Sequence, residues 1–464
     1  MASNPHLLAL SAFVNEHPTI KLVKPSSPEF SSLRKVWNSS HSGLPLAIVQ
    51  PQSALDVAVL IQFVKANSLP FTIRTGGHNL EGRSAVDNAL QIDLRALNTV
   101  TISPDRKSAT VGGGILQQEL GNRLSEEGLA VATGSVPSVG YTGWATYGGY
   151  GPSSSHWGFG GWTKSSGIRG AGGVFGVIVD LTIKLYPLPG LLAGPIIFDS
   201  TDIAKAFVDF NTAYTHLLDT EGLPAQLTLQ RVCFNSPRGR VLAASFVWSG
   251  SHSEIEEGQR WASKIASLAP CKMNAAAPTT IPEWFARNGG RVPSSVYGSS
   301  WTHNLVRIPE HVAEVIGQNI ARLPSDSGMM FSLHQLRGPS VEPDASRLPS
   351  VFASREPHYM LEILRYGAIE SAREAAEKWA AQMATDIEEA GPGNVLRTAY
   401  VSVYNAARAE SPGKALKKTY GEHAGLVREL KARWDPGKLF KLAVQAMERK
   451  ECQDALTVGA IVVL

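Results

Sequence analysis

The sequence predicts an α+β protein with more than one domain, and three observations support this class. The chain has 464 residues, which is longer than one ordinary hydrophobic core accommodates. Hydrophobic residues make up 43% of it and charged residues 18%, a composition typical of a globular protein. Short β-rich runs alternate with segments of helical spacing in both halves of the chain.

The first half begins its regular structure with a strand–helix–strand pattern over residues 44–73. "LPLAIVQP" is a short apolar run, "SALDVAVLIQFVKANSL" has helical spacing after the N-cap candidate Ser53, and "PFTIRT" is rich in β-formers. "LQIDL", "TVTISP" and "SATVGGG" predict further strands, and "ILQQELGNRLSEEGL" predicts a helix closed by Gly128. This half is therefore predicted to be α+β with mixed strands.

After Pro189 the pattern changes to long amphipathic helices interleaved with strands. The predicted helices are "DIAKAFVDFNTAYTHLL", "EIEEGQRWASKIASL", "PEHVAEVIGQNIARL" and "IESAREAAEKWAAQMATDIEEA". The predicted strands are "AQLTLQRVCF", "VLAASFVW", "MMFSLHQL" and "YMLEILRY". The order favours a second α+β domain over about residues 190–395. A last helix, in "YGEHAGLVRELKARWDPGKLF", is stopped by Asp435 and Pro436.

Composition and charge exclude several classes of function. The net charge is only +3 and no Lys/Arg-rich tract is present, so nucleic acid is not an expected partner. The three cysteines include no CxxC pair and the histidines of the second half are scattered, so no metal site is expected. The start lacks a secretory pattern and no apolar run is long enough to span a bilayer. We therefore expect a cytoplasmic or otherwise intracellular protein with no membrane partner. The sequence does not predict its oligomeric state.

Two glycine-rich stretches are the candidates for ligand binding. The loop at residues 75–79, "TGGHN", can turn successive N–H groups inward as a nest for phosphate oxygens, although a plain turn with a solvent-facing histidine explains it equally well. Residues 133–176 are rich in Gly and Ser with interspersed tryptophans, which indicates ordered backbone close to something flat or anionic. "GIRGAGGVFG" within it does not fit a dinucleotide-binding fingerprint, because a strand follows where a helix would have to begin.

Taken in order, these motifs are more specific than any one of them. "IRTGGHN", "ATVGGG", "TGSVPSVGYTGWATYGGYGPSS", "GIRGAGGVFGVIVDLTIKLYPLP" and "YGEHAGLVRELKARWDPGKLF" resemble the FAD-linked oxidases of the vanillyl-alcohol-oxidase type, in particular their berberine-bridge-like branch. The resemblance implies a PCMH-type FAD-binding fold of two subdomains over residues 1–190. It also implies a substrate domain over residues 191–395, with an antiparallel sheet flanked by helices, and a segment at 396–464 that returns to the FAD domain.

The same resemblance implies which residues bind FAD. The loop from Arg74 to Asn79 would wrap the pyrophosphate, and the family often bonds the histidine matching His78 to the flavin 8α-methyl group. A neutral imidazole is a competent nucleophile near neutral pH. Ser135 stands where many relatives have a second, cysteine, attachment, so one covalent link at most is expected. The implied cofactor-binding residues are Arg74, Thr75, Gly76, Gly77, His78, Asn79, Ser135, Gly140, Gly148, Gly149, Gly151, Gly172, Gly173 and Val177.

One departure from the family bears on the flavin site. Relatives continue through an aspartate-bearing loop and a strand pair before their "RGAGG" motif, whereas this chain has only "GWTKSS" between Gly160 and Gly167. About two dozen residues are absent by this comparison, the size of one strand–turn–strand unit. The missing piece would normally contribute sheet and one wall of the FAD site.

Two functions from different classes follow. The first is an FAD-dependent oxidase that transfers a hydride from an alcohol, amine or polycyclic metabolite to flavin N5, with reoxidation by O₂ and a side chain that takes a proton. Tyr400, Tyr404 and His334 are the candidate bases, and Glu362 is a further candidate in a strand; for each, a structural role in a sheet is the alternative. The second function is that of a flavin-free relative, a binding protein or cyclase that uses the old pocket to shape a substrate.

Overall fold

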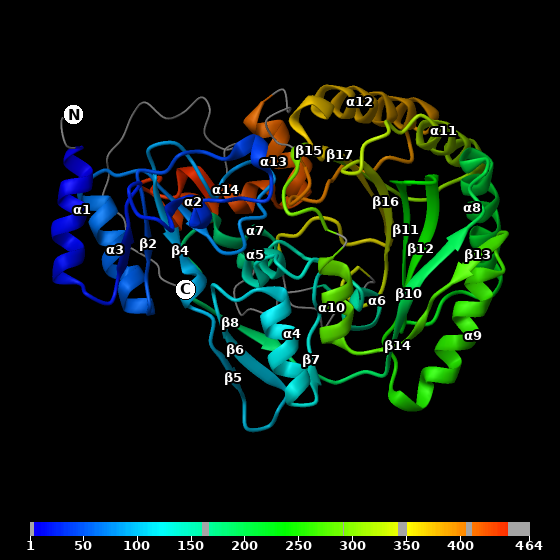
Figure 1. Ribbon diagram of the computed structural model, residues 1–464, viewed down its shortest axis with the longest axis horizontal. Helices are drawn as coiled ribbons and strands as arrows, with labels where there is room; N and C mark the ends of the chain where they lie inside the picture. The colour runs from blue at the N-terminus through cyan, green and yellow to red at the C-terminus, as the bar shows by residue number, and fades with distance from the viewer. Residues whose placement is uncertain (1–3, 160–166, 291, 342–349, 405–410, 444–464) are drawn as a thin grey trace.

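The computed structural model describes residues 4–159, 167–290, 292–341, 350–404 and 411–443. It confirms the α+β class: two parts lie side by side, one built on small sheets and one on a large antiparallel sheet with helices along its outer face (Figure 1). Within the described ranges no helix is both long and apolar enough to cross a membrane.

The first sheet has four strands in the order β1-β2-β4-β3. Its parallel pairs are β2–β4 and β3–β4, and β1 runs antiparallel to β2. The predicted strand–helix–strand unit is therefore present, but β4 lies between its two strands. Ser53 caps the helix by accepting from the Asp56 N–H, as predicted. The elements are α1 (Pro5–Glu16), β1 (Lys21–Val23), α2 (Phe30–Leu33), β2 (Ala47–Gln50), α3 (Ala54–Ala66), β3 (Phe71–Arg74) and β4 (Leu90–Asp93).

A second small sheet has the order β5-β6-β8, and β7 pairs with β9 in a separate ribbon. The strand predicted to follow "GIRGAGGVFG" is divided between β8 and β9, which belong to different sheets. Leu120 and Leu124 of α4 pack with Ile183 of β8 in one core. The elements are β5 (Val100–Ile102), β6 (Ser108–Gly112), α4 (Gln117–Glu126), β7 (Leu129–Ala130), β8 (Asp180–Lys184) and β9 (Tyr186–Pro187).

The second part is built on an eight-stranded sheet ordered β13-β10-β12-β11-β16-β17-β15, with β14 also pairing β10. Four long helices line its outer face (Figure 1) and bury Phe207, Ile265, Ile316 and Met383 against it. The strands are β10 (Leu191–Phe198), β11 (Leu227–Ser236), β12 (Gly239–Trp248), β13 (Cys271–Asn274), β14 (Ala277–Thr279), β15 (Tyr297–Leu305), β16 (Met330–Leu336) and β17 (His358–Gly367). The helices are α8 (Ile203–Thr220), α9 (Ile255–Ala266), α10 (Ile281–Gly289), α11 (Glu310–Ala321) and α12 (Arg373–Ala390).

The glycine-rich stretch and the C-terminal helices join the two parts. In its described residues the stretch forms only short elements: α5 (Tyr141–Thr146), α6 (Ser154–Trp157), α7 (Ile168–Ala171) and η3 (Gly172–Val174). Further on are α13 (Pro412–Tyr420) and α14 (Ala424–Trp434). The Lys431 ammonium of α14 donates to the Val174 carbonyl at 2.7 Å, and Phe440 packs edge-on against Phe71 at 5.5 Å. The described C-terminal residues thus lie against the first part of the chain.

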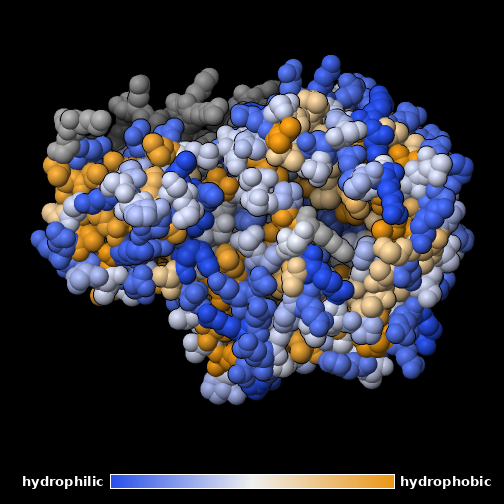
Figure 2. Space-filling model, viewed as in Figure 1, coloured by the Kyte–Doolittle hydropathy of each residue, from blue (hydrophilic) through white to orange (hydrophobic). Residues whose placement is uncertain are grey.

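On the face of the molecule shown in Figure 2, hydrophilic and hydrophobic residues gather at opposite ends. Figure 2 shows mostly hydrophilic residues over α9 and α12, the outer helices of the large sheet. Hydrophobic residues gather at the opposite end, over α1 and α3, where Leu8 and Leu55 are 58% and 72% exposed.

A buried histidine on β15 makes stability depend on pH. His303 is 2% exposed, and its Nε2–H donates to the Ala384 carbonyl at 3.3 Å. Burial, aided by the Lys418 ammonium, lowers the pKa of His303 to about 4, although the solvent-screened Glu388 carboxylate lies 3.4 Å from Nε2. The unfolded chain binds this proton near pH 6.5 and the folded chain near pH 4. The free energy of unfolding therefore falls as pH drops through that window.

We expect His303→Gln to flatten the pH dependence of stability. For this one group the effect between about pH 7 and pH 4 is up to about 3 kcal/mol. Urea denaturation at a neutral and a mildly acidic pH measures it. The matched control is His311→Gln, because His311 is exposed on α11. Equal pH dependence in wild type and His303→Gln would contradict the assignment.

Candidate active site

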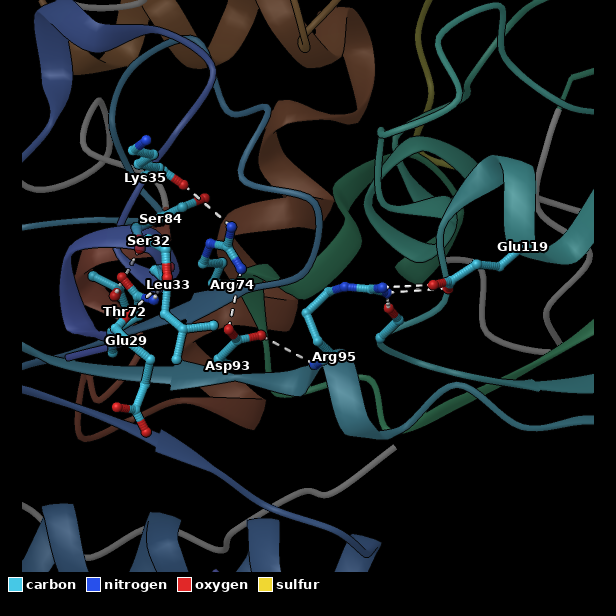
Figure 3. A network of polar contacts seen from close by, with 12 residues as sticks. Glu29, Ser32, Leu33, Lys35, Thr72, Arg74, Ser84, Asp93, Arg95 and Glu119 are labelled. Atoms are coloured by element: carbon cyan, nitrogen blue, oxygen red, sulfur yellow. Dashed lines mark hydrogen bonds and ion pairs between the residues drawn. The ribbon is translucent and has the colours of Figure 1, made fainter. Parts of the chain in front are cut away.

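A buried ion pair fixes the start of the "TGGHN" loop. Arg74 ends β3 and lies opposite Asp93 at the end of β4, and their side chains pair at 3.1 Å (Figure 3). The Asp93 side chain is fully buried, and this burial raises its pKa although Arg74 opposes the shift. Arg74 also donates to the Lys35 carbonyl at 3.1 Å. These two contacts therefore hold the Arg74 guanidinium in one position beneath the loop.

The glycine pair brings two loops into backbone contact. A Cβ on Gly76 would lie 2.4 Å from the Gly140 nitrogen and 2.5 Å from the Ser138 oxygen. Gly77 has φ +71°, a conformation that side chains with a Cβ disfavour. The loops at 75–79 and 135–140, both predicted from sequence to bind FAD, therefore lie together in the structure.

His78 stands at the meeting point of these loops. Its Nε2 lies 2.9 Å from the Ser138 hydroxyl, and its ring stacks on Trp37 with centroids 5.5 Å apart and planes at 22°. Burial, and then the charge of Arg74, lowers the pKa of His78 to about 4. The imidazole is therefore neutral, and thus nucleophilic, at neutral pH.

Trp37 ties this histidine to the large sheet. Its backbone N–H donates to the Gly77 carbonyl at 3.0 Å, and its carbonyl accepts from the Val296 N–H at 2.9 Å. Its indole N–H donates to the Pro293 carbonyl at 2.8 Å. One residue thus connects the His78 loop to the segment that leads into β15.

The remaining loop residues make local contacts. Asn79 accepts from the N–H groups of Glu81 and Arg83 and so closes its own turn. The Thr75 hydroxyl donates to the Gly113 carbonyl at 3.4 Å. The Ser135 carbonyl accepts from Asn288 at 3.4 Å, which joins the second loop to α10.

The glycines further along mostly meet other protein segments. A Cβ at each of four positions would come within 2.6 Å of protein atoms; these are Gly148 (against Phe352), Gly149 (Trp144), Gly151 (the Thr133 carbonyl) and Gly172 (Tyr147). A Cβ on Gly173 would meet nothing within 4 Å, and Val177 is 1% exposed in the core of the first sheet. The glycines allow the stretch to fold tightly on itself, and their contact with FAD stays a prediction.

A cluster of titratable groups forms where the glycine-rich stretch meets the large sheet. The Tyr150 hydroxyl donates to the Glu362 carboxylate of β17. His334 Nε2 of β16 lies 3.2 Å from the other oxygen of that carboxylate and 2.9 Å from the Ser332 hydroxyl. Ser332 and Glu362 are directly opposite on paired strands. The Tyr150 ring packs edge-on against the rings of His334 at 4.6 Å and Tyr400 at 5.1 Å.

The charge of this cluster resides on Glu362. Burial alone raises the pKa of a carboxyl group, but His334, Tyr150 and Ser332 together outweigh it and hold the pKa of Glu362 below its ordinary value. Burial, with the neighbouring carboxylate, raises the pKa of Tyr150 well above its ordinary value. The site therefore holds an anionic carboxylate next to a neutral phenol at neutral pH, an arrangement able to accept a proton.

Apolar side chains surround the cluster. Leu336, Phe352, Met360, Tyr400 and Val403 form one buried group, against which Tyr150 and Phe159 pack. Such surroundings strengthen interactions of the carboxylate because little water screens them.

The structure unites two of the three predicted bases. His334 and Tyr400 both contact Tyr150. The charge that acts on Tyr404 is that of Glu81, and Tyr404 is not part of these contacts. Sequence analysis missed Tyr150, although Tyr150 lies in the glycine-rich stretch that was predicted to lie against the cofactor. It named Glu362 only by its strand position, and what it lacked was the pairing of β16 with β17.

Two buried donors near the loops suit an anionic, polar cofactor. Among the described residues, Arg74 Nε has no hydrogen-bond partner, and neither does Gln117 Nε2, whose Oε1 accepts from the Gly134 N–H at 3.2 Å. Buried donors ordinarily have partners, so these two fit a ligand with acceptor oxygens. The shortened segment predicted after Gly160 lies outside the described residues. In the part of the chain that the structure describes, no cluster of three or more His, Cys, Asp or Glu residues could hold a metal ion.

Comparisons with known proteins bear on the cofactor and on the class of enzyme. Residues 45–161 match the family model described as "FAD binding domain". The FAD-linked oxidoreductase aurO of Gibberella zeae is 27% identical, over 93% of this chain and 87% of that protein. Among solved structures, BBE-like 1 of Physcomitrella patens has TM-score 0.77 at 15% identity, covering 96% of this chain and 100% of that one. Glucooligosaccharide oxidase of Acremonium strictum, described with a 6-S-cysteinyl, 8α-N1-histidyl FAD, has TM-score 0.78 at 15% identity, covering 94% and 98%.

The chain is an enzyme of the FAD-linked oxidoreductase class, with an FAD-binding domain in its first part. More narrowly, it is an FAD-dependent oxidase with the PCMH-type fold expected from its sequence, and its fold is similar to that of berberine-bridge-enzyme-like proteins.

Gly76→Ala tests the contact between the two loops. The new methyl group would overlap the backbone at Gly140, and such overpacking costs about 1–3 kcal/mol. We expect a lower melting temperature and less flavin per protein, measured by thermal unfolding and by absorbance. The control is Gly143→Ala, because Gly143 is exposed and a Cβ there meets nothing within 4 Å. If both variants retained wild-type flavin content, the loop contact would not shape the cofactor site.

Proposed function

We propose that this oxidase acts on an aromatic or polycyclic alcohol or amine, with Glu362 as the base that accepts the substrate's hydroxyl or amine proton. The observation that carries the proposal is the largely buried, anionic Glu362 carboxylate held by Tyr150 and His334. Aromatic and aliphatic side chains around it favour an apolar, ring-containing substrate over a sugar, whose hydroxyl groups would need more polar partners.

In this proposal residues 1–190 and 396–464 hold FAD and residues 191–395 supply most of the substrate site. The loops at 74–79 and 135–151 would hold the cofactor, with Arg74 Nε and Gln117 Nε2 as donors. Bound FAD would take a hydride from the substrate and return to its oxidised form with O₂.

The protein's own groups manage the proton. Glu362 accepts it from the substrate heteroatom, either directly or through the Tyr150 hydroxyl that donates to it. His334 and Ser332 hold the carboxylate in place, and Tyr400 packs against the Tyr150 ring. The apolar group around Met360 and Phe352 excludes water from the proton path.

We further propose that FAD is bonded covalently through His78 alone. The neutral His78 ring, fixed at the junction of the two loops, supports this link. Ser135 does not supply the second, thioether, attachment because it has no sulfur atom.

Acid precipitation tests the covalent link. We expect purified protein to be yellow and the colour to stay with the acid pellet, while His78→Ala releases the flavin into the supernatant. Absorbance of pellet and supernatant measures the partition. Flavin that stays in the His78→Ala pellet would assign the attachment to another residue. A colourless protein that FAD does not reconstitute would instead favour the flavin-free binding protein or cyclase.

Glu362→Gln tests the base. We expect kcat to fall about 10²- to 10⁴-fold with flavin content unchanged, because the amide does not accept the proton. Peroxide release from benzylic alcohols, hydroxylated polycyclic aromatics and cyclic secondary amines identifies a working substrate and then measures the loss.

Tyr404→Phe is the matched control, because its hydroxyl lies outside the Glu362 contacts. Equal activity of wild type and Glu362→Gln would remove Glu362 as the base. A loss confined to Tyr404→Phe would move that role to Tyr404.

A further inference from the structure

Tyr150 lies on a backbone of intrinsically high freedom. It stands between Gly149 and Gly151, and glycine allows more backbone conformations than any other residue. The Tyr150 hydroxyl nevertheless donates to the Glu362 carboxylate of β17, which belongs to the other part of the enzyme. A contact that fixes the backbone of Tyr150 therefore also fixes the hydroxyl against this carboxylate.

Trp144 of α5 makes such a contact through two of its groups. Its indole N–H donates to the Tyr150 carbonyl at 3.0 Å, and its own carbonyl accepts from the Gly149 N–H at 2.9 Å. The indole also lies so close to Gly149 that a Cβ there would come within 2.3 Å of the ring. Because an indole nitrogen only donates, the direction of the bond to Tyr150 is fixed.

The indole is itself held in place by neighbouring segments. A Cβ on Gly134 would lie 2.9 Å from Nε1 of Trp144, and the Gly134 N–H donates to the buried Gln117 side chain at 3.2 Å. The Tyr141 ring packs against the indole with centroids 5.5 Å apart. These contacts restrict the ring to a position from which its N–H reaches the Tyr150 carbonyl.

We propose that Trp144 is a positioning residue that holds Tyr150, through the indole N–H, so that the Tyr150 hydroxyl donates to Glu362. This inference rests on the proposed function, in which Glu362 is the base. It goes beyond that role by naming a residue that acts on the base through Tyr150.

Loss of the Tyr150 hydrogen bond would change the charge state of Glu362. Burial raises the pKa of this carboxyl group, and hydrogen bonds and the charge of His334 lower it by more. Without the donation from Tyr150 the pKa of Glu362 rises, so the base is anionic only at higher pH. The polar and titratable groups that act on this carboxylate, or on which it acts, are Tyr150, His334, Ser332, Tyr366 and Tyr400.

Substitutions at Trp144 separate the hydrogen bond from packing. Trp144→Phe keeps a large aromatic ring without an N–H group. Trp144→His has a smaller ring, but its Nε2–H takes the place of the indole Nε1–H, because both atoms occupy the same position in a five-membered ring. A role in packing alone makes phenylalanine the better replacement, whereas the proposed role makes histidine the better one.

Two further variants complete the set. Replacement of Trp144 by 3-benzothienylalanine puts sulfur in place of the N–H at nearly unchanged shape, and it tests the bond even where Trp144→Phe does not fold. Trp157→Phe is the matched control, because Trp157 lies in the same glycine-rich stretch and its ring stacks on Tyr186 at 4.6 Å.

The experiment measures the pH dependence of turnover. Full-length, FAD-loaded variants are assayed by peroxide release from whichever benzylic alcohol, hydroxylated polycyclic aromatic or cyclic amine wild type oxidises fastest. Melting temperature and flavin content are measured on the same samples. For Trp144→Phe and the benzothienyl variant we expect kcat about three- to tenfold lower at neutral pH, the effect of losing one hydrogen bond. Their acidic limb of kcat should move to higher pH.

A double variant tests whether the effect passes through Tyr150. Tyr150→Phe should move the acidic limb in the same direction, and adding Trp144→Phe to it should move the limb no further. Trp144→His and Trp157→Phe should keep the wild-type limb.

The outcomes separate this inference from the proposed function. A wild-type rate and limb in the benzothienyl variant, or Trp144→His as impaired as Trp144→Phe, overturns the role of Trp144, while Glu362 stands as the base if Glu362→Gln is inactive. Full activity of Glu362→Gln overturns the proposed function and this inference together.

Discussion

The hydrogen bond from Tyr150 to Glu362 is the interaction on which the proposed chemistry depends. A carboxylate this deeply placed would be costly in its charged form without partners. Tyr150 comes from the glycine-rich stretch of the first part, and Glu362, His334 and Ser332 come from the large sheet. The anion is therefore stable only when both parts are in place. The proposed base therefore becomes available only when the two parts of the enzyme are assembled.

A similar dependence holds at the other end of the site. His78 stays neutral because it is buried beside Arg74, and Arg74 is held in position by a carboxylate with no exposed surface. Figure 3 shows this pair at the carboxyl ends of β3 and β4, with Arg95 and Glu119 continuing the network toward α4. The ion pair of Arg74 and Asp93 under the loop thus helps to keep the His78 imidazole uncharged. The uncharged imidazole is the nucleophilic form.

Local sequence signals predicted much of the fold. Features that depend on residues far apart in the sequence were not predicted. Helices such as α3 and α8 were predicted because their spacing and caps lie within a few residues. Sequence analysis missed β15 because its buried side chains include Ser300, Thr302 and Asn304, which give no hydrophobic alternation. The insertion of β4 between β2 and β3 also has no local sequence signal, since pairing is decided by distant residues. The loop proposed to bind flavin could be named from one contiguous motif, whereas the contact between Tyr150 and Glu362, 212 residues apart, is formed only when the glycine-rich stretch meets the large sheet.

Trp37 has a consequence for the N-terminal region. Its backbone bonds to Gly77 on one side and to Val296 on the other, so the segment between β1 and β2 connects both parts of the enzyme like a strap. The strap shares one residue with the stack on His78. Any movement that separates the two parts would pull directly on the ring that the flavin is proposed to join. Opening of the two parts around a substrate is therefore restrained by the same tryptophan that stacks on the proposed attachment residue of the flavin.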